Sequence, residues 1–571
     1  MSLKIKLTII LFIILSAIAL GVVGVYAVLD IDFVVNGDVV YTYSPFKYTY
    51  DTENLTASVA ASSTDLSGDI EIPATVMYKN QEYTVNAISE NGFKDTLITT
   101  VTLPNTITTL NASAFNNCSE LTNLNMPSGI TEIPASCFYS CGNLRMVSLS
   151  NITTIGERAF EGVGGIISLA IPSHVSTVGA NAFASSTIEK LLIVGNPDLG
   201  SSCFAQCQLL ETVNLGENLI DIPNGCFSDC GKLSNVVFSP KLIDIKGRAF
   251  YHCTGLTAIN LPSKLYFIGG EAFSGCGIAG DLVISKNIRE IGSSAFAGCK
   301  IKTLQITGNL EWLSVAYGGP FQSCQLLETV NLGEYLTTIP SYCFVGCVKL
   351  SSVIFSPKLT SIGGYTFADC SRLTTVNLPT TLTIIGVSCF ERSGIKNLVI
   401  PASVTTIYQY AFRASGLQTL EIEGNPTWEW VGSSMSTGHQ TFAGCNLLYR
   451  VDLGEKLTFI PIACFANCSK LKVVNFSKVM SVIADNAFIN CTSLTEITIP
   501  STMTAIRSGA FANCTNISVI KINSNLNPAN CSLKAGAFPN NTGMQIIIPK
   551  GSINAYKTYW TDYSSFFVQA S

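Results

Sequence analysis

The chain has few charged residues and almost no histidine. Asp, Glu, Lys and Arg make up 12% of its 571 residues, and the formal net charge is −5. Nucleic-acid binding requires Lys and Arg clustered against phosphates, so no nucleic-acid partner is expected. The three histidines, His174, His252 and His439, lie far apart in the sequence. This spacing predicts neither a metal site nor a histidine-based active site, and no cofactor is expected.

Sequence motifs of catalysis are lacking as well. There is no glycine-rich phosphate loop, nucleophile elbow or calcium-binding nonapeptide. Solenoid enzymes that cleave polysaccharides need carboxylates clustered on adjacent coils. Here Glu211, Glu328, Asp452 and Glu496 are scattered, and outward strand positions are mainly Thr, Ser and Asn. We therefore expect that the protein is not an enzyme.

What the sequence does contain is one unit repeated along most of its length. In the copy Leu359–Pro379 the apolar spacing fits neither a helix of period 3.6 nor one long strand of period 2. Its phenylalanine recurs twenty times, mostly at steps of 22 or 23 residues. A fixed period of this size predicts a solenoid whose coils bury their apolar faces against each other. The recurring residues are Phe93, Phe115, Phe138, Phe160, Phe183, Phe204, Phe227, Phe250, Phe273, Phe296, Phe321, Phe344, Phe367, Phe390, Phe412, Phe442, Phe465, Phe488, Phe511 and Phe538.

The repeated motif resembles the BspA-like leucine-rich repeat family. It reads L-x-x-V-x-L-P-x-x-L-x-x-I-G-x-x-A-F-x-x-C, as from Leu256 through Pro262 and Phe273 to Cys276. The resemblance covers about residues 93 to 543. It implies a secreted or surface-displayed protein, in several members an adhesin, with no catalytic residues. We predict a right-handed, mainly β solenoid of about 20 coils with one continuous parallel sheet and little helix.

The two ends of the chain differ from the repeat. Residues 1–28, with Lys4 and Lys6 before an apolar run, predict a signal peptide or an N-terminal membrane anchor. Cleavage after Ala27 is favoured, and the uncleaved anchor remains open. Residues 29–92 are predicted to form a β-hairpin N-terminal cap, because Asn36-Gly37 favours a two-residue hairpin turn. Residues 93–543 then form the solenoid.

Residues 544–571 are predicted to form a C-terminal cap. A short helix carrying Tyr556, Tyr559 and Trp560 is expected to cover the apolar face of the last coil. A second hairpin is expected near the other end, between Tyr78 and Tyr83. Both caps are needed because an uncovered coil exposes an apolar end and open strand edges.

The array also has a longer period of five coils. The segment Cys207–Glu217, CQLLETVNLGE, recurs unchanged at Cys324–Glu334 and with changes at Cys445–Glu455. The phenylalanines of the FSPKL segments at Phe238 and Phe355 follow the same period. A multiplied block favours an extended, repeated surface over a single pocket.

Cysteine is frequent, with 21 residues, and almost always in register. Fourteen follow the repeat phenylalanine by three residues, six directly precede it, and only Cys531 is out of register. Pairs such as Cys343 and Cys347 have a C-x-x-x-C spacing that matches neither zinc nor redox motifs. A buried, mostly reduced column is favoured, although an exported chain meets an oxidising compartment and disulfides remain open.

Two long connections interrupt the period and suggest where a ligand binds. They are the 25-residue step from Phe296 to Phe321 and the 30-residue step from Phe412 to Phe442. Amphipathic aromatic residues on loops are common binding anchors, whereas the same rings also serve to seal the side of a coil. The candidate ligand-binding residues on these connections are Trp312, Tyr317, Trp428, Trp430 and His439.

The sequence thus predicts an exported or cell-surface interaction protein. We expect an adhesin that binds an extracellular protein or glycan of a host or neighbouring cell across a solenoid face. A glycan-binding or purely structural cell-envelope protein is the alternative. The only membrane contact expected is through residues 1–28.

Overall fold

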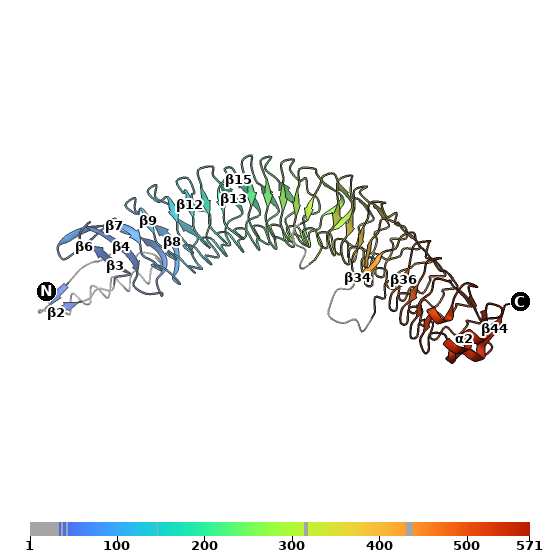
Figure 1. Ribbon diagram of the computed structural model, residues 1–571. Coiled ribbons are helices and arrows are strands. Elements are labelled where there is room, and N and C mark those ends of the chain that lie inside the picture. Colours follow the sequence, from blue (N-terminus) through green and yellow to red (C-terminus); the bar gives the residue numbers. More distant parts are fainter. Residues whose placement is uncertain are drawn as a thin grey trace. The chain divides into compact units, whose positions relative to one another are not determined.

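A computed structural model describes residues 33–35, 38–40, 44–145, 147–312, 318–429 and 438–570. These residues form a β-solenoid of about twenty coils, which confirms the predicted fold class (Figure 1). The chain divides into two compact units, Met1–Leu265 and Tyr266–Ser571. The predicted export segment, residues 1–28, lies outside the described residues. Within the described part, no helix is both long and apolar enough to cross a membrane.

The first unit begins with the two hairpins that the sequence predicts. Strands β1 (Phe33–Val35) and β2 (Asp38–Val40) pair antiparallel, as do β6 (Thr75–Tyr78) and β7 (Gln81–Ile88). Strands β6 and β7 join β3 (Phe46–Asp51) and β4 (Thr56–Ala61) in a sheet of order β3-β4-β7-β6. Strand β7 also pairs in parallel with the first short solenoid strand, β9 (Thr109–Leu110), so this sheet covers the beginning of the solenoid.

Most coils contribute two short strands, and strands of successive coils pair in parallel and in register. One series of strands precedes a proline or glycine turn, as Ile171 precedes Pro172, and the second series ends at a glycine or proline, as Val178 precedes Gly179. The expectation of one continuous parallel sheet is therefore wrong. Proline cannot donate to a sheet ladder and glycine favours turns, so each coil is bent into two strand segments instead of one.

In the first unit, β5 (Ser67–Glu71) pairs with the beginning of the first series. The first series is β8 (Leu97–Thr102), β10 (Asn123–Leu124), β13 (Ser168–Ile171), β15 (Lys190–Ile193), β17 (Thr212–Asn214) and β19 (Asn235–Val237). The second series is β9, β11 (Glu132–Ile133), β12 (Thr154–Ile155), β14 (Thr177–Val178), β16 (Asp198–Leu199), β18 (Asp221–Ile222) and β20 (Asp244–Ile245).

The second unit continues both patterns. Its first series is β22 (Ala279–Ile284), β24 (Lys300–Ile306), β26 (Thr329–Asn331), β28 (Ser352–Ile354), β31 (Asn397–Ile400), β33 (Thr419–Ile422), β35 (Arg450–Asp452), β37 (Val473–Asn475), β39 (Glu496–Ile499), β41 (Val519–Ile522), β43 (Gln545–Ile548) and β44 (Phe567–Gln569). Its second series is β21 (Phe267–Ile268), β23 (Glu290–Ile291), β25 (Glu311–Trp312), β27 (Thr338–Ile339), β29 (Ser361–Ile362), β30 (Ile384–Ile385), β32 (Thr406–Tyr408), β34 (Thr427–Glu429), β36 (Phe459–Ile460), β38 (Val482–Ile483), β40 (Ala505–Ile506) and β42 (Ser532–Leu533).

The repeat phenylalanines form a stacked column in the core of each unit. Ring centroids of successive coils lie 5.0 Å apart at Phe160 and Phe183, and 5.9 Å apart at Phe321 and Phe344. The five-coil period adds a second ring: Phe355 meets Phe367 edge to face at 5.9 Å. Stacked and edge-to-face pairs both stabilise a core beyond simple area burial.

Residues with left-handed backbone conformation flank the repeat phenylalanine in most coils. Around Phe367 they are Tyr365 (φ 57°) and Asp369 (φ 62°), two residues before and two after the ring. The pair turns the chain sharply, so that the ring between them points into the core. This conformation is unfavourable for bulky side chains, and most coils place Gly, Ser, Asn or Asp there.

All 21 cysteines are free and buried. Those that follow the phenylalanine by three residues use the thiol as a hydrogen-bond donor. Cys141 Sγ donates to the carbonyl oxygen of Phe115 in the preceding coil at 3.0 Å, and Cys370 Sγ donates to that of Phe344 at 3.3 Å. The repeat cysteines therefore form the buried, in-register column that the sequence favours.

The C-terminal residues cover the last coil. Helix α2 (Ile553–Tyr559) follows the short 3₁₀ helix η2 (Pro528–Asn530), and the 3₁₀ helix η3 (Thr561–Phe566) leads into β44. Tyr556 and Trp560 are buried, and the Trp560 indole donates to the Cys531 carbonyl at 3.1 Å. Tyr559 is 56% exposed, so it does not join the cover as expected.

Candidate binding surface

Trp312 and Trp428 lie in strands, not on the longer connections where the sequence analysis placed them. Trp312 ends β25 opposite Ile291, and Trp428 lies in β34 opposite Ile407. Both indoles are half-buried. They occupy the position of Leu199 in the first of the three five-coil blocks. In both connections the extra residues follow the tryptophan in the sequence.

The two indoles make different contacts. Trp312 Nε1 donates to the Thr338 carbonyl oxygen at 3.0 Å. Strands β25 and β27 belong to different sheets, so this hydrogen bond links the end of one sheet to the beginning of the next. The Trp428 indole nitrogen is buried and has no hydrogen-bond partner among the described residues. Trp312 therefore helps to hold successive coils together.

His439 lies beside Trp428 and is built into the coil ladder. Its backbone N–H donates to the Ile462 carbonyl at 3.0 Å, and its carbonyl accepts from the Tyr410 N–H at 2.9 Å. Burial lowers the pKa of His439, and a hydrogen bond to the Trp428 backbone together with the charge of Glu429 opposes part of that shift. The other two candidates, Tyr317 and Trp430, lie outside the described residues.

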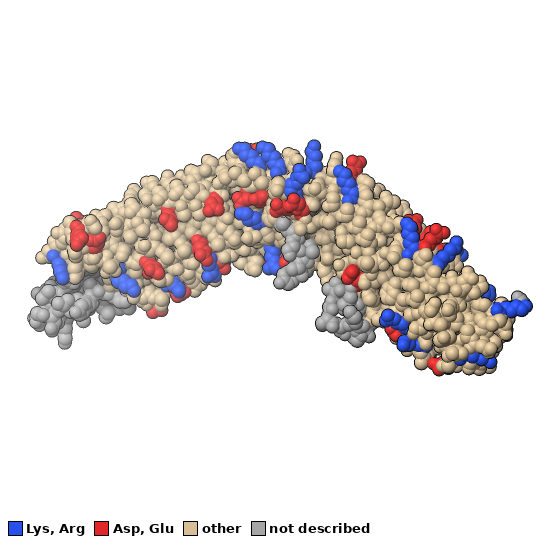
Figure 2. All heavy atoms as spheres, viewed as in Figure 1, with Lys and Arg blue, Asp and Glu red and all other residues tan. Residues whose placement is uncertain are grey.

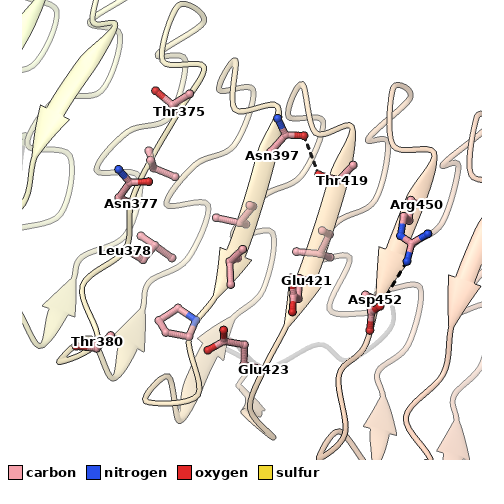
Figure 3. Close-up of a pocket in the computed structure, with 15 residues that line it drawn as sticks. Thr375, Asn377, Leu378, Thr380, Asn397, Thr419, Glu421, Glu423, Arg450 and Asp452 are labelled. Carbon is pink, nitrogen blue, oxygen red and sulfur yellow. Dashed lines mark hydrogen bonds and ion pairs between the residues drawn. The ribbon is translucent and has the colours of Figure 1, made fainter.

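A groove crosses the first-series strands β31, β33 and β35 of the second unit (Figure 3). Its volume is about 710 Å³. Strand register places Val399 opposite Glu421 and Glu421 opposite Asp452, so these three outward side chains form a row across neighbouring strands. We call this feature the strand-face groove. Asn397 lines it as well and accepts a hydrogen bond from the Thr419 hydroxyl at 2.7 Å.

Most polar groups of the groove are held in place by neighbours. Asp452 Oδ2 lies 3.8 Å from Arg450 Nη2 and accepts from Asn475 Nδ2 at 3.1 Å. Glu423 Oε2 accepts a backbone N–H at 3.3 Å. The exposed Glu421 carboxylate has neither a hydrogen-bond nor an ion-pair partner among the described residues. It is a free acceptor of the groove, next to the exposed Val399.

The pairing of Glu421 with Asp452 was not predicted from the sequence. Asp452 is 31 residues from Glu421 instead of the usual 22 or 23, so the two acids did not fall in the same repeat position. Alignment of the coils across the insertion supplies the signal, since TLEI at Thr419 and RVDL at Arg450 then fall in register. Strand pairing in register brings these outward residues to within about 5 Å between backbones.

Charged side chains are sparse over the rest of the face drawn in Figure 2. They are separated by wide areas of uncharged residues, in keeping with the low charge content of 12%. Local clusters of charge and aromatic residues therefore stand out from a background of Thr, Ser and Asn.

Stacked coils with two short parallel strands and an in-register phenylalanine define a leucine-rich repeat solenoid. The chain belongs to the BspA type leucine rich repeat region family, whose model matches residues 86–209, 197–316, 318–425 and 435–564. No curated protein was found to match the chain.

Several solved structures are similar to this chain. A leucine-rich repeat protein from Bacteroides ovatus is 21% identical over 89% of this chain and 99% of that chain, with a TM-score of 0.48. A leucine rich cell surface protein from Faecalibacterium prausnitzii is 19% identical over 91% and 97%, with a TM-score of 0.23. The pneumococcal vaccine antigen PcpA is 15% identical over 89% and 98%, with a TM-score of 0.28.

Proposed function

We propose that the protein is an exported, surface-displayed interaction protein, an adhesin that binds a macromolecule of a host or neighbouring cell across a solenoid face. The observation that carries the proposal is the strand-face groove, where the free carboxylate of Glu421 lies between the exposed Val399 and the fixed Asp452. Such a row accepts hydrogen bonds from the amine, guanidinium or hydroxyl groups of a partner.

The solenoid suits this role because its strands are fixed by pairing on both sides. Binding groups that are already ordered lose less conformational entropy when a partner arrives. The proposal places residues 1–28 outside the binding region, as the segment that directs export or anchors the chain. Catalysis is not part of it.

The test is a binding screen with the full chain as exported. Arrays of purified extracellular proteins and of glycans are probed with the labelled protein and with a groove variant carrying Glu421→Gln and Asp452→Asn. Glu496→Gln is the matched control, because Glu496 is an exposed acid on the same strand series and pairs with Lys521.

The proposal expects binding to at least one protein and a loss of about tenfold or more in the groove variant only. Binding confined to glycans establishes the glycan-binding alternative. No binding to either array, with the chain correctly folded, contradicts the proposal and leaves a structural envelope role.

A further inference from the structure

Three coils of the second unit carry a tyrosine at the left-handed position two residues before the repeat phenylalanine. They are Tyr342 (φ 63°), Tyr365 (φ 57°) and Tyr410 (φ 60°), within four successive coils. The other coils of this unit place other residues there: Glu271, Ser294, Gly319, Ser388, Gln440, Ala463, Asn486, Gly509 and Gly536.

The fold does not require tyrosine at these positions. Ser388 occupies the same position between Tyr365 and Tyr410, with the same sign of φ. Arg158, Arg248, Glu271 and Gln440 also place bulky side chains at this position in other coils, so the backbone conformation alone marks no site. What distinguishes these coils is the same aromatic residue in three of four successive coils, which indicates a role beyond folding.

The three tyrosines form a partly exposed edge: Tyr342 is exposed, and Tyr365 and Tyr410 are half-buried. The rings of Tyr342 and Tyr365 stack with centroids 4.9 Å apart and planes inclined by 3°. Tyr342 is 37% exposed. The guanidinium of Arg413 lies 5.3 Å from the ring centroid of Tyr410. Each of these rings is therefore held by a neighbouring side chain before any partner arrives.

Charged residues one or two positions after the repeat phenylalanine of these coils complete the edge. Arg392 donates to both carboxylate oxygens of Asp369 at 2.6 and 2.8 Å, and to Glu391 at 2.7 Å. Arg413 lies 3.9 Å from the buried Glu391. The side chains of Arg392 and Arg413 remain 52% and 47% exposed.

We propose that this Tyr–Arg ridge, formed by Tyr342, Tyr365, Tyr410, Arg392 and Arg413, is a docking surface for a folded protein that presents a carboxylate to Arg413. The inference rests on the proposed interaction function and adds a second site and a partner class to it. Tyrosine and arginine are the residues most enriched at protein–protein hot spots, and rigid tyrosines bind at low entropic cost. Arg413 is the recognition cation because its contact with Glu391 is long, whereas Asp369 and Glu391 hold Arg392 through short bonds.

The ring geometry favours a protein over a glycan. A sugar ring stacks on the open face of an aromatic ring, but Tyr342 and Tyr365 each cover one face of the other. Charge complementarity then selects an acidic patch on that protein.

The experiment is a selection of peptides from a naive library of disulfide-constrained 12-residue sequences against the full chain. The ridge variant carries Tyr342→Ser, Tyr365→Ser and Tyr410→Ser. The control carries serine at Tyr266, Tyr335 and Tyr449, which are 45%, 49% and 47% exposed outside the ridge. The prediction is that the selected peptides are rich in Asp and Glu and bind the ridge variant at least tenfold more weakly than the control.

Arg413→Gln is expected to remove the preference for acidic peptides. The ridge variant should melt at the wild-type temperature or above, since serine is native at Ser388. If its melting temperature falls, the single variant Tyr342→Ser, at the most exposed ring, decides the binding question.

Peptides that bind the ridge variant as well as the wild type, or no enriched peptides, overturn the inference. So does competition at the ridge by cello- or chito-oligosaccharides alone, which assigns the ridge to glycans. The peptide selection tests the Tyr–Arg ridge, whereas the array screen tests the strand-face groove. Either experiment can fail while the other succeeds, so failure of the ridge and failure of the proposed function are distinguishable.

Discussion

Cys118 Sγ lies 3.0 Å from the carbonyl oxygen of Phe93 in the preceding coil and donates a hydrogen bond to it. The same relationship joins Cys491 to Phe465 at 3.2 Å in the second unit. A thiol at this position fills a small core space and also supplies a donor to a buried carbonyl group. Alanine is smaller and has no donor, and a disulfide uses up the thiol proton.

The first prediction concerns the redox state of the 21 cysteines. In the folded protein the buried thiols should not react with a thiol reagent, whereas most of them should react after denaturation without reductant. The measurement is a spectrophotometric thiol count before and after adding guanidinium chloride. A count near zero in the denatured protein would show that disulfides join the coils.

Alkaline pH should destabilise the fold through the same residues. Burial raises the pKa of Cys445 from 9.0 to about 11 and that of Cys531 to about 12. A raised folded-state pKa contributes stability that is complete below pH 9 and lost as pH rises toward 11. Each such thiol should cost about 1.4 kcal/mol per pH unit in that window.

The measurement is the urea midpoint between pH 7 and pH 11. The midpoint should be level to about pH 8.5 and then fall. In Cys445→Ala, unfolding should release about one proton fewer, so the midpoint should fall less steeply with pH. A midpoint that stays constant from pH 9 to pH 11 would show that the thiols are not buried in the protonated form.

The phenylalanine column should dominate core stability. Phe367→Ala is expected to destabilise the fold by about 3–5 kcal/mol, because a large buried ring is removed from a packed core. The control is Phe355→Ala in the same coil, since Phe355 is only half-buried and meets Phe367 edge to face. Equal melting temperatures for wild type and Phe367→Ala would be incompatible with the stacked solenoid.

Trp428 should behave as a packing residue whose size is not essential. Trp428→Leu introduces the residue found at Leu199 in the first of the three five-coil blocks and should change the melting temperature little. Trp428→Ser should lower stability by about 2–4 kcal/mol, because it removes half-buried apolar surface and adds a hydroxyl. If both variants melt like the wild type, the indole contributes through binding and not through packing.

Much of the fold was predictable because the repeat is regular. Period, residue type and register agree in twenty copies around residues such as Phe367 and Cys370, so local irregularities average out. The division into two strand series was not predicted, since strands of two residues such as Ser361–Ile362 leave almost no pattern of alternation. Nor was the left-handed position of Tyr365, which an ordinary propensity argument assigns to Gly or Asn.

The candidate site was harder to predict, because insertions shift the register. A sequence step of 30 residues shows that a coil is longer, but not where the extra residues leave it. Trp428 was therefore assigned to the insertion that it precedes, and Glu421 was not matched with Asp452. Only pairing between neighbouring coils fixes which residues share a face.

Binding of a macromolecule at the strand-face groove is measured by the dissociation constant of the full chain for the best-binding protein or glycan from the array screen. The proteins compared are the wild type, the Glu421→Gln and Asp452→Asn groove variant, and the Glu496→Gln control. We expect at least tenfold weaker binding for the groove variant, with the affinity of the control and all three melting temperatures unchanged. Equal affinity of the wild type and the groove variant would show that the groove is not the binding site.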